Sequence, residues 1–395
     1  MLKGKTVLLG VTGSIAAYKI ANLASMLVKQ HCDVHVIMTE NATNFINPIT
    51  FETLTNNRCL VDTFDRNFEF NVNHISLAQK ADMMLIAPAS ANIIAKLAHG
   101  IADDMLSTTA LACDKPILVS PAMNTRMYEN SITQDNIDTL RGYNFTIIEP
   151  EIGRLACNDV GTGKMASENV LMDYIMREIA CEKDLHGKKI LITAGPTREA
   201  VDPVRFISNH SSGKMGYALA RQAMFRGADV TLITGPTALT PPPFVEVINV
   251  ESAKEMFEEV ITIATKQDII IKSAAVADYK PVSTAKEKIK KKDGNAVIEL
   301  ARTQDILSHL GSNKKEGQIL CGFSMETENL IENSKKKLET KHADMIVANN
   351  LKENGAGFGT DTNVVTLITK DETVELPLLS KDEVANRVLS KLAAM

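Results

Sequence analysis

Two stretches of the sequence combine a glycine turn with a lysine, a combination that can hold a phosphate group. They are RLACNDVGTGKMAS (154–167) and ISNHSSGKMG (207–216). A phosphate-binding P-loop reads G-x-x-x-x-G-K-[ST], with a hydroxyl after the lysine. In both stretches a methionine follows the lysine, and Asn158 or Ser208 stands where the first glycine belongs. Neither stretch is therefore expected to bind a nucleoside triphosphate as a P-loop does.

Each half of the chain also opens with a β-rich run, a glycine turn and a helical pattern. These openings are LLGVTGSIAAYK (8–19) and LITAGPTREAVDP (191–203). Backbone N–H groups at a helix N-terminus favour phosphates. Neither opening has the G-x-G-x-x-G spacing of dinucleotide-binding proteins, which disfavours ordinary NAD binding. At each opening, the spacing fits a phosphate-binding loop and an ordinary turn equally well.

The elements around these stretches predict an α/β protein with largely parallel sheets, because apolar β-rich runs alternate with helical patterns such as 15–30 and 168–180. In the first half the expected strands are 6–11, 34–39, 83–89, 116–123 and 145–150. After the polar segment EKDLHGKK the pattern restarts with 190–197, 229–235, 245–250, 268–276, 318–325 and 344–350. An antiparallel pair, 364–369 and 373–379, precedes a closing helix. A domain boundary is expected near 181–188.

Length and composition exclude several classes of protein. The 395 residues favour two or three domains. The formal net charge of -5 gives no sign of nucleic-acid binding. No apolar run approaches the roughly 18 residues of a membrane helix, and the N-terminus lacks the features of a signal peptide. The six cysteines show no C-x-x-C or zinc-like spacing, so we expect free thiols in the cytoplasm.

Eight motifs spread over almost the whole chain carry a family resemblance. In the first half they are GVTGSIAAYK, NHISLAQKADMMLIAPASANIIAKLAHGIADDML, PAMNTRMYEN and GRLACNDVGTGKMA. In the second half they are ITAGPTREAVDPVRFISNHSSGKMG, AAVADY, EKIKKK and GFSMETEN. In this order they resemble the bifunctional phosphopantothenoylcysteine decarboxylase / phosphopantothenate–cysteine ligases of coenzyme A biosynthesis. The resemblance implies two Rossmann-like parallel-sheet domains: a flavodoxin-like decarboxylase domain (1–181) and a ligase domain with an added antiparallel strand pair (189–395).

For the first domain, the resemblance implies an FMN-dependent decarboxylation. Loss of carbon dioxide from an acylated cysteine needs an electron sink, which side chains do not offer. FMN oxidises the thiol to a thioaldehyde, and the enethiolate left by decarboxylation is then reduced and protonated. His74 matches the catalytic base, Cys157 the proton donor on a flap over the substrate, and Asn124 the residue that holds the substrate carboxylate. The FMN-binding positions are Gly13, Ser14, Thr39, Pro88, Ala89 and Ser90.

Taken alone, these residues have plainer interpretations. His74 would more often be a surface or capping histidine, and Asn124 a turn residue. Lys164 is either an anion contact or a solvated flap residue. Asn158 replaces the glycine usual after the cysteine, but asparagine tolerates left-handed backbone, so we expect the flap geometry to survive.

For the second domain, the resemblance implies a CTP-dependent ligase. A carboxylate must be activated before an amine can attack it, because its oxygen is a poor leaving group. Phosphopantothenate and CTP form an acyl-cytidylate, cysteine displaces the nucleotide, and lysines with Mg²⁺ stabilise the charge. Lys288 matches the catalytic lysine, although a lysine run is more often a solvated face. Asn209 matches the residue tied to the intermediate, and Arg205 and Lys214 match substrate positions.

The nucleotide positions follow from the same resemblance. They are Lys272, Ser273, Ala274, Asp278, Lys288, Gln304, Asp305, Ile306, Leu307, Phe323, Lys337 and Lys341. Asp278 is also the expected Mg²⁺ ligand. Gln304 stands where the family commonly has proline, and Asn350 where aspartate is frequent. The choice of CTP rests on the bacterial two-domain fusion, since no residue here distinguishes cytosine from adenine.

Other functions fit the sequence less well. A non-catalytic flavin-binding subunit tends to have lost the histidine or the flap cysteine, and both are present here. A flavin decarboxylase acting on a peptide's C-terminal cysteine leaves residues 189–395 without a role. The family resemblance further implies a homo-oligomer, with trimers of the flavin domain assembled into a dodecamer and dimers of the ligase domain.

Overall fold

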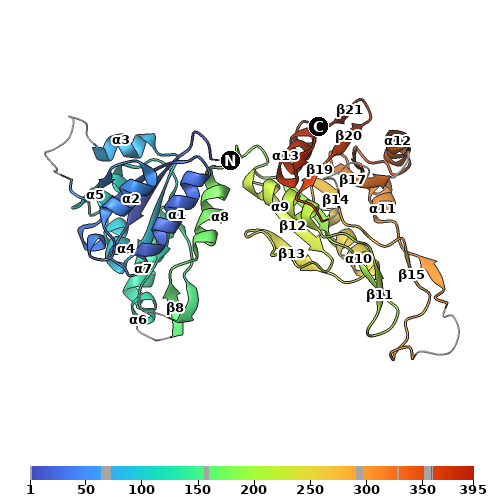
Figure 1. Cartoon of the computed structure of the whole chain (residues 1–395), viewed down its shortest axis with the longest axis horizontal. Coiled ribbons are helices and arrows are strands. Elements are labelled where there is room, and N and C mark those ends of the chain that lie inside the picture. Colours follow the sequence, from blue (N-terminus) through green and yellow to red (C-terminus); the bar gives the residue numbers. More distant parts are fainter. Residues whose placement is uncertain are drawn as a thin grey trace. The chain divides into compact units, whose positions relative to one another are not determined.

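The chain folds into two compact units, Met1–Cys181 and Glu182–Met395 (Figure 1). The computed structural model describes residues 2–63, 73–154, 160–290, 297–326, 329–350, 357 and 359–395. Within this described part, no helix has both the length and the apolar character required to cross a membrane. The division between the units falls at the start of the polar segment 182–189.

The first unit is built on a six-stranded parallel sheet with the order β3-β2-β1-β4-β5-β6. Its strands are β1 (Thr6–Val11), β2 (Asp33–Met38), β3 (Cys59–Leu60), β4 (Met83–Ala89), β5 (Ile117–Pro121) and β6 (Thr146–Ile147). Without the two-residue edge strand β3, this is the strand order of flavodoxin. All residues of β1, β4 and β5 are buried, which explains their continuous apolar runs. The predicted sheet is confirmed, although the expected strand 145–150 is only two residues long.

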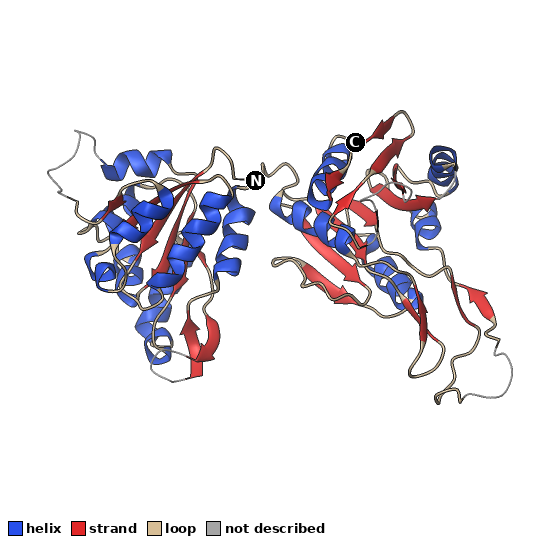
Figure 2. Ribbon diagram, viewed as in Figure 1, coloured by secondary structure: helices blue, strands red, loops and turns tan. Residues whose placement is uncertain are grey.

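Helices cover both faces of this sheet (Figure 2). One group comprises α1 (Ala17–Lys29), α2 (Pro48–Thr55) and α8 (Glu168–Ile179). The other comprises α3 (Asn73–Lys80), α4 (Ala91–Ala98), α5 (Met105–Ala112) and α7 (Ser131–Gly142). Shorter elements follow individual strands: η1 (Glu40–Asn44), α6 (Thr125–Tyr128) and the antiparallel strands β7 (Glu151–Arg154) and β8 (Val160–Lys164). The covered faces leave the strand ends as the places where a ligand can bind.

The second unit contains an eight-stranded sheet with the order β13-β12-β9-β14-β17-β18-β20-β21. Six strands are parallel: β9 (Lys189–Ala194), β12 (Asp229–Thr234), β13 (Glu246–Asn249), β14 (Ile269–Lys272), β17 (Ile319–Glu326) and β18 (Met345–Asn350). β20 (Val365–Thr369) and β21 (Thr373–Glu375) continue the sheet in antiparallel pairing. The predicted Rossmann-like sheet with an added antiparallel pair is therefore confirmed.

Two helix layers enclose this sheet as well. α9 (Lys214–Phe225) packs against the closing helix α13 (Lys381–Ala393). α10 (Ala253–Ala264), α11 (Ile306–Ser312) and α12 (Leu330–Thr340) contribute to a separate core cluster against the strands. Three small antiparallel pairs were not predicted: β10 (Arg198–Ala200) with β11 (Phe206–Ser208), β15 (Tyr279–Pro281) with β16 (Leu300–Arg302), and β19 (Thr362–Asn363) with β22 (Leu379–Ser380). Strands of two or three residues are too short to show an alternating pattern.

Candidate active sites

The predicted flavin residues gather at one edge of the first sheet. Gly13 and Ser14 follow β1, and Thr39 follows β2. Pro88 and Ala89 end β4, Ser90 caps α4, and Asn124 caps α6 after β5. These are the carboxyl ends of neighbouring parallel strands, where open α/β sheets bind their ligands. Residues far apart in the sequence are thus brought to one site.

A buried threonine, which the sequence analysis did not single out, ties two of these loops together. The Thr12 side chain is 1% exposed. Its hydroxyl donates to the carbonyl oxygen of Pro88 at 2.6 Å and accepts from the backbone N–H of Ser90 at 3.0 Å. The loop after β1 therefore fixes the backbone of the loop after β4.

The polar groups at this edge fit a bound ligand such as FMN. The hydroxyl oxygens of Thr39 and Ser120 are buried and have no hydrogen-bond partner within the described residues. A buried hydroxyl without a partner costs about 1–3 kcal/mol. Ser120 lies on β5, next to β4, and Thr39 directly follows β2. Thr39 and Ser120 therefore offer hydroxyls to a ligand at the carboxyl ends of β2 and β5.

Of the proposed catalytic residues of this domain, His74 is the second residue of α3, which Figure 1 draws at the end of the first unit away from α6 and β8. Cys157 and Asn158 lie outside the described residues. The strands that flank them are held against the Asn124 loop: the N–H of Met123 donates to the carbonyl oxygen of Gly163 at 3.1 Å. A Cβ at Gly161 would lie 2.5 Å from Thr125 Oγ1, so only glycine allows this close approach.

Lys164, expected as an anion contact or a solvated flap residue, forms an ion pair within the β7–β8 strand pair. Its ammonium lies 3.0 Å from Glu151 Oε2 across the β7–β8 pair. Glu151 also accepts from the backbone N–H of Ser167 at 2.8 Å. Burial opposes ionisation of Glu151, but the Lys164 and Ser167 hydrogen bonds lower its pKa. The lysine of the first glycine-lysine stretch is thus engaged within the strand pair.

We expect Thr12→Val to weaken FMN binding about tenfold. Valine keeps the shape of threonine but leaves the Pro88 carbonyl and the Ser90 N–H without their partner, at a cost of about 1–3 kcal/mol. Titration of the apoprotein with FMN, followed by quenching of flavin fluorescence, measures the Kd. Thr139→Val is the matched control, because that hydroxyl is exposed on α7. Equal affinity in both variants would show that the Thr12 bridge does not shape the site.

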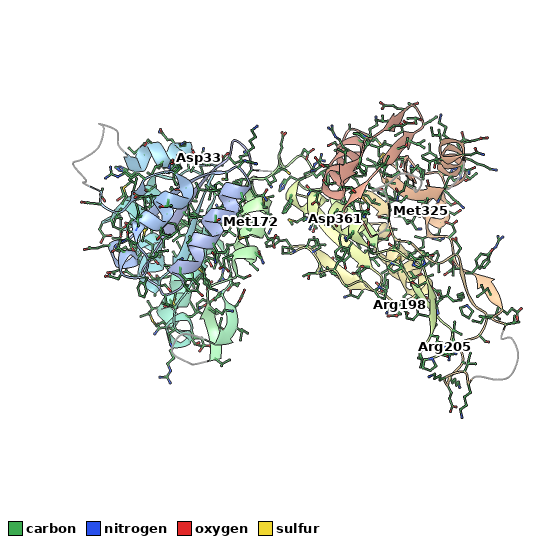
Figure 3. The ribbon with its side chains drawn as sticks, viewed as in Figure 1. Asp33, Met172, Arg198, Arg205, Met325 and Asp361 are labelled. Atoms are coloured by element: carbon green, nitrogen blue, oxygen red, sulfur yellow. The ribbon has the colours of Figure 1, made fainter. Side chains whose placement is uncertain are left out.

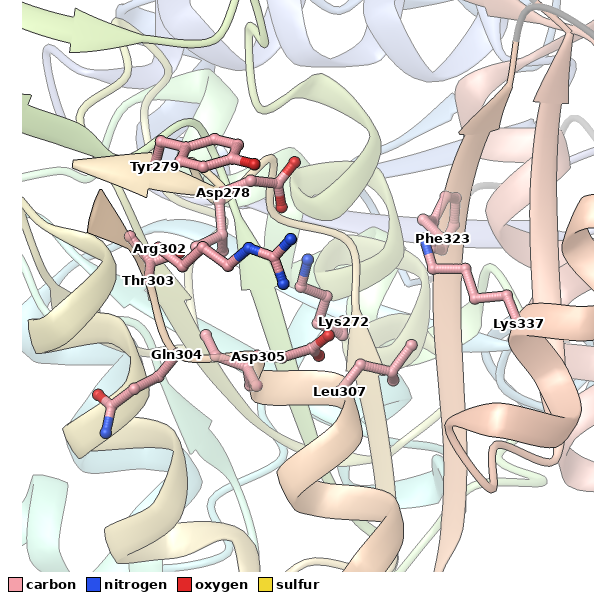
Figure 4. A pocket seen from close by; sticks show the side chains of 12 residues that line it. Lys272, Asp278, Tyr279, Arg302, Thr303, Gln304, Asp305, Leu307, Phe323 and Lys337 are labelled. Atoms are coloured by element: carbon pink, nitrogen blue, oxygen red, sulfur yellow. The ribbon is translucent and has the colours of Figure 1, made fainter. Parts of the chain in front are cut away.

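The second unit contains a cavity of about 440 Å³ at the ends of β14 and β17 (Figure 4). Eight of the predicted nucleotide residues line it: Lys272, Asp278, Gln304, Asp305, Ile306, Leu307, Phe323 and Lys337. The sequence analysis missed four further lining residues: Val276, Tyr279, Arg302 and Thr303. Arg302 ends the unpredicted strand β16, and its guanidinium points into the cavity together with the Lys272 ammonium.

The charges of this cavity suit a polyphosphate. Burial lowers the pKa of Lys272 to about 8, and the positive charge of the nearby Lys337 acts in the same direction. The carboxylates of Asp305 and Asp278 act against this shift. Burial also acts on Asp305, but hydrogen bonds from Lys341 at 2.8 Å and from the Ser308 N–H at 2.9 Å lower its pKa. Lys341 is therefore engaged in neutralising Asp305 and does not line the cavity. An anion entering the cavity meets Lys272, Lys337 and Arg302.

This pKa predicts a pH dependence of nucleotide binding. Lys272 carries its charge below about pH 8 and loses it above. We expect the affinity for CTP to fall by up to about tenfold between pH 8 and pH 9, since one pKa unit corresponds to 1.36 kcal/mol. Isothermal calorimetry across this range measures the change. Lys272→Arg keeps the charge and should flatten the profile; an unchanged fall in that variant would assign the titration to another group.

A second cavity, of about 550 Å³, continues from the first. The two share Lys272, Val276, Asp278, Phe323 and Lys337, so they form one cleft. The predicted residues Asn209, Lys214, Ser273 and Ala274 line this second part. Gly195 and Gly213 adopt positive φ angles of 73° and 79°, which lets their two loops pack backbone against backbone. The second glycine-lysine stretch thus forms a wall of the cleft.

Polar side chains in this part of the cleft are only partly satisfied. Asn209 Nδ2 donates to the carbonyl oxygen of Ala275 at 3.0 Å. Lys214 donates to Gly359 O at 2.9 Å and to Asp361 Oδ1 at 2.7 Å. Asn349, which was not predicted, is 8% exposed, and its Oδ1 has no partner among the described residues. The neighbouring Asn350 has its side chain outside that described part.

Two predicted ligase residues lie away from the cleft. Arg205 and Lys288 are exposed and line neither cavity. Arg205 lies in the turn between β10 and β11 (Figure 3), and Lys288 lies between β15 and β16. The part of the chain that the structure describes holds no group of three side chains able to bind a metal. Asp278 lines both cavities, and Mg²⁺ is often held by one or two carboxylates plus substrate phosphates.

Sequence comparisons match both units to known families. The family described as "Flavoprotein" matches residues 1–180. "DNA/pantothenate metabolism flavoprotein C-terminal domain" matches residues 185–395. The "Coenzyme A biosynthesis bifunctional protein CoaBC" of Bacillus subtilis is 47% identical and covers 100% of this chain and 98% of its own length. The protein of the same name from Escherichia coli is 39% identical, covering 99% and 97%.

Solved structures resemble each unit separately. A crystal structure of the C-terminal domain of a CoaBC protein is 49% identical, with a TM-score of 0.47, and covers 54% of this chain and 98% of that one. A mutant PPC decarboxylase complexed with pantothenoylaminoethenethiol is 30% identical, with a TM-score of 0.39, covering 43% and 96%. The sequence matches extend over both units and nearly the full length of the relatives. The chain therefore belongs to the family of coenzyme A biosynthesis bifunctional proteins.

Proposed function

We propose that the chain catalyses two consecutive steps of coenzyme A biosynthesis. The domain 189–395 joins 4′-phosphopantothenate to cysteine with CTP, through an acyl-cytidylate. The domain 1–181 then decarboxylates phosphopantothenoylcysteine to 4′-phosphopantetheine with FMN. The observation that carries this proposal is the match of both units, over the full chain, to relatives named as bifunctional proteins of this pathway.

In the ligase reaction the cleft of the second unit binds the nucleotide and the acyl group side by side. Lys272, Lys337 and Arg302 hold the triphosphate, and Asp278 holds the accompanying Mg²⁺. Asn209 and Lys214 face the acyl part in the adjoining cavity. Because the two cavities share lining residues and form one cleft, the carboxylate of phosphopantothenate can reach the α-phosphate of CTP within it. Arg205, in the turn between β10 and β11, and Lys288, between β15 and β16, supply two further positive charges for the reaction from outside the two cavities.

In the decarboxylase reaction the edge of the first sheet binds the flavin and the substrate. FMN supplies a reversible two-electron oxidation when bound. Ser14, Thr39 and Ser90 would hold it by hydrogen bonds, together with the loop of Pro88 and Ala89. Asn124 holds the substrate carboxylate through its amide. His74 accepts a proton from the substrate, and Cys157 returns one to the product.

The proposal includes the setting of the enzyme. The substrates are small molecules, and neither nucleic acid nor a membrane takes part. The enzyme works in the cytoplasm, which agrees with the free thiols of Cys32, Cys59, Cys113 and Cys321. It is a homo-oligomer, a dodecamer built from trimers of the flavin domain and dimers of the ligase domain.

One reaction mixture tests both steps. Purified protein is incubated with phosphopantothenate, cysteine, CTP and Mg²⁺, and products are followed by mass. We expect phosphopantetheine in the complete mixture and none without CTP. Protein stripped of FMN should accumulate phosphopantothenoylcysteine instead. Failure to form that intermediate would refute the ligase assignment, and failure to convert supplied intermediate after FMN reconstitution would refute the decarboxylase assignment.

A further inference from the structure

We propose that Asp202 is a positioning residue for the ligase reaction, because it fixes the segment that carries Lys288 and the side chain of Arg205 to one another. The residue lies within the motif ITAGPTREAVDPVRFISNHSSGKMG, but the sequence analysis did not single it out. The inference rests on the proposed ligase function. It identifies Asp202 as the group that positions Arg205 and Lys288, the two cationic residues that line neither cavity.

Asp202 is a buried carboxylate on an exposed turn. It is 2% exposed, whereas Arg205 and Lys288 are both exposed. Its Oδ1 accepts from the backbone N–H groups of Val204 and Arg205, both at 2.8 Å. An aspartate that bonds to the backbone two and three residues ahead sets the shape of a turn. This first oxygen therefore fixes the backbone of Arg205.

The second oxygen of Asp202 holds a different part of the chain. Oδ2 accepts from the N–H of Ile289, the residue after Lys288, at 3.1 Å. It also lies 3.5 Å from the Arg205 guanidinium, which donates to the carbonyl oxygen of Ile289 at 3.4 Å. Asp202 thus stands between the backbone next to the proposed catalytic Lys288 and the side chain of the proposed substrate-binding Arg205.

Further hydrogen bonds join the same two segments. The N–H of Ala285 donates to Val201 O at 3.0 Å, and the Thr284 hydroxyl donates to Ala200 O at 3.1 Å. Segment 284–289 therefore runs along the turn 200–205, at the outer part of the β10–β11 pair where Figure 3 labels Arg205. The other bonds named between these two segments have backbone carbonyl oxygens as acceptors, which a substitution leaves in place. Among the named acceptors, the Asp202 carboxylate is therefore the one that a substitution can remove.

This arrangement has a chemical consequence. Two cations on exposed loops repel each other and lose conformational freedom when they are brought to one anion. The Asp202 carboxylate carries the opposite charge beside the Arg205 guanidinium and holds the Lys288 segment through the Ile289 N–H, so the two parts are fixed relative to one another before substrate arrives. Misplacement of a catalytic group by about 1 Å can cost about 10²-fold in rate. Asp202 supplies this placement without touching the substrate.

Asp202→Asn separates this role from a general effect on folding. Oδ1 receives two backbone N–H groups, so the asparagine carbonyl oxygen takes that position and keeps the turn. Its amide then presents N–H groups to the Ile289 N–H and the Arg205 guanidinium, where only an acceptor fits. The variant therefore keeps the turn and releases the Lys288 segment. Asp382→Asn, which removes one carboxylate paired with Arg221 on the same domain, is the matched control.

The experiment measures ligase kinetics and hydrogen exchange on the full-length holoenzyme. In Asp202→Asn we expect kcat for amide formation to fall about 10–10²-fold, with the KM for CTP within about twofold of wild type. Backbone exchange in 284–289 should be faster. Conversion of supplied phosphopantothenoylcysteine by the other domain should be unchanged, which excludes global damage. In the background of Lys288→Gln, the Asp202→Asn change should cost little more, because both act through one group.

The possible results separate the inference from the function it rests on. Faster exchange in 284–289 with normal kcat would overturn the positioning role. The role would also be overturned if the losses of kcat caused by Asp202→Asn and Lys288→Gln added in full in the double variant. Normal turnover in Lys288→Gln alone would overturn it as well. In either case Asp202 would act on something other than Lys288. If the wild-type protein forms no amide, the proposed ligase function fails instead. Unchanged hydrogen exchange of segment 284–289 in Asp202→Asn would by itself reject the link between Asp202 and that segment.

Discussion

Lys288→Gln is expected to slow CTP-dependent amide formation by about 10²–10³-fold, the usual effect of removing one group that stabilises charge in a transition state. Glutamine keeps much of the length of the side chain but not its positive charge. Because Lys288 lines neither cavity, the KM for CTP should change little. Steady-state release of pyrophosphate, together with the mass of phosphopantothenoylcysteine, measures the effect on each half of the ligation.

Lys290→Gln is the matched control, since it removes the same charge two residues away in the same lysine run. We expect it to retain near-normal turnover. If both variants lose activity equally, the run acts through its total charge rather than through one catalytic lysine. Normal turnover in Lys288→Gln would remove its assignment altogether.

Cys157→Ser is expected to reduce formation of phosphopantetheine by at least about 10²-fold, as for loss of a general acid. A serine hydroxyl is a far weaker acid than a thiol, so the enethiolate left by decarboxylation is not protonated. The oxidised product, two hydrogens lighter than phosphopantetheine, should accumulate. Mass spectrometry of a single turnover with supplied phosphopantothenoylcysteine distinguishes the two products.

The same variant should ligate phosphopantothenate to cysteine at the wild-type rate, because that reaction belongs to the other unit. Cys113→Ser provides the matched control, since this half-buried thiol is distant in sequence from the flap. Full conversion to phosphopantetheine by Cys157→Ser would show that another group donates the proton.

The main strands could be predicted because burial on both faces leaves a strong local signal. β1, β4 and β14 are nearly or wholly buried, and each appears in the sequence as a short run of apolar, mostly β-branched or aliphatic residues. The antiparallel pair β20–β21 was likewise visible as two runs before a closing helix. The two- and three-residue strands left no such signal, although β15 and β16 place Tyr279 and Arg302 at the cleft.

The resemblance named residues, but it did not indicate what surrounds them. Lys272 and Lys337 were both expected at the nucleotide, yet the lowered pKa of Lys272 arises only because the fold buries it close to Lys337. Lys164 was expected as an anion contact or a solvated residue, and its pairing with Glu151 depends on the β7–β8 strands. Thr12 and Asp202 lie within two of the quoted motifs, but nothing in the sequence singled them out; their contacts are hydrogen bonds to residues more than 70 positions away.

The sequence by itself determined the class of fold, the division into two similar halves, and the family. These properties depend on local apolar periodicity and on the order of short motifs, both of which are written along the chain. Only the tertiary structure decided which charges meet and which hydroxyls are buried without partners among the described residues. It also decided that Asp202 holds both Arg205 and the backbone next to Lys288, away from the cleft. Electrostatic and hydrogen-bond energies depend on distances of a few ångströms between distant residues, and those distances exist only after the sheets have formed.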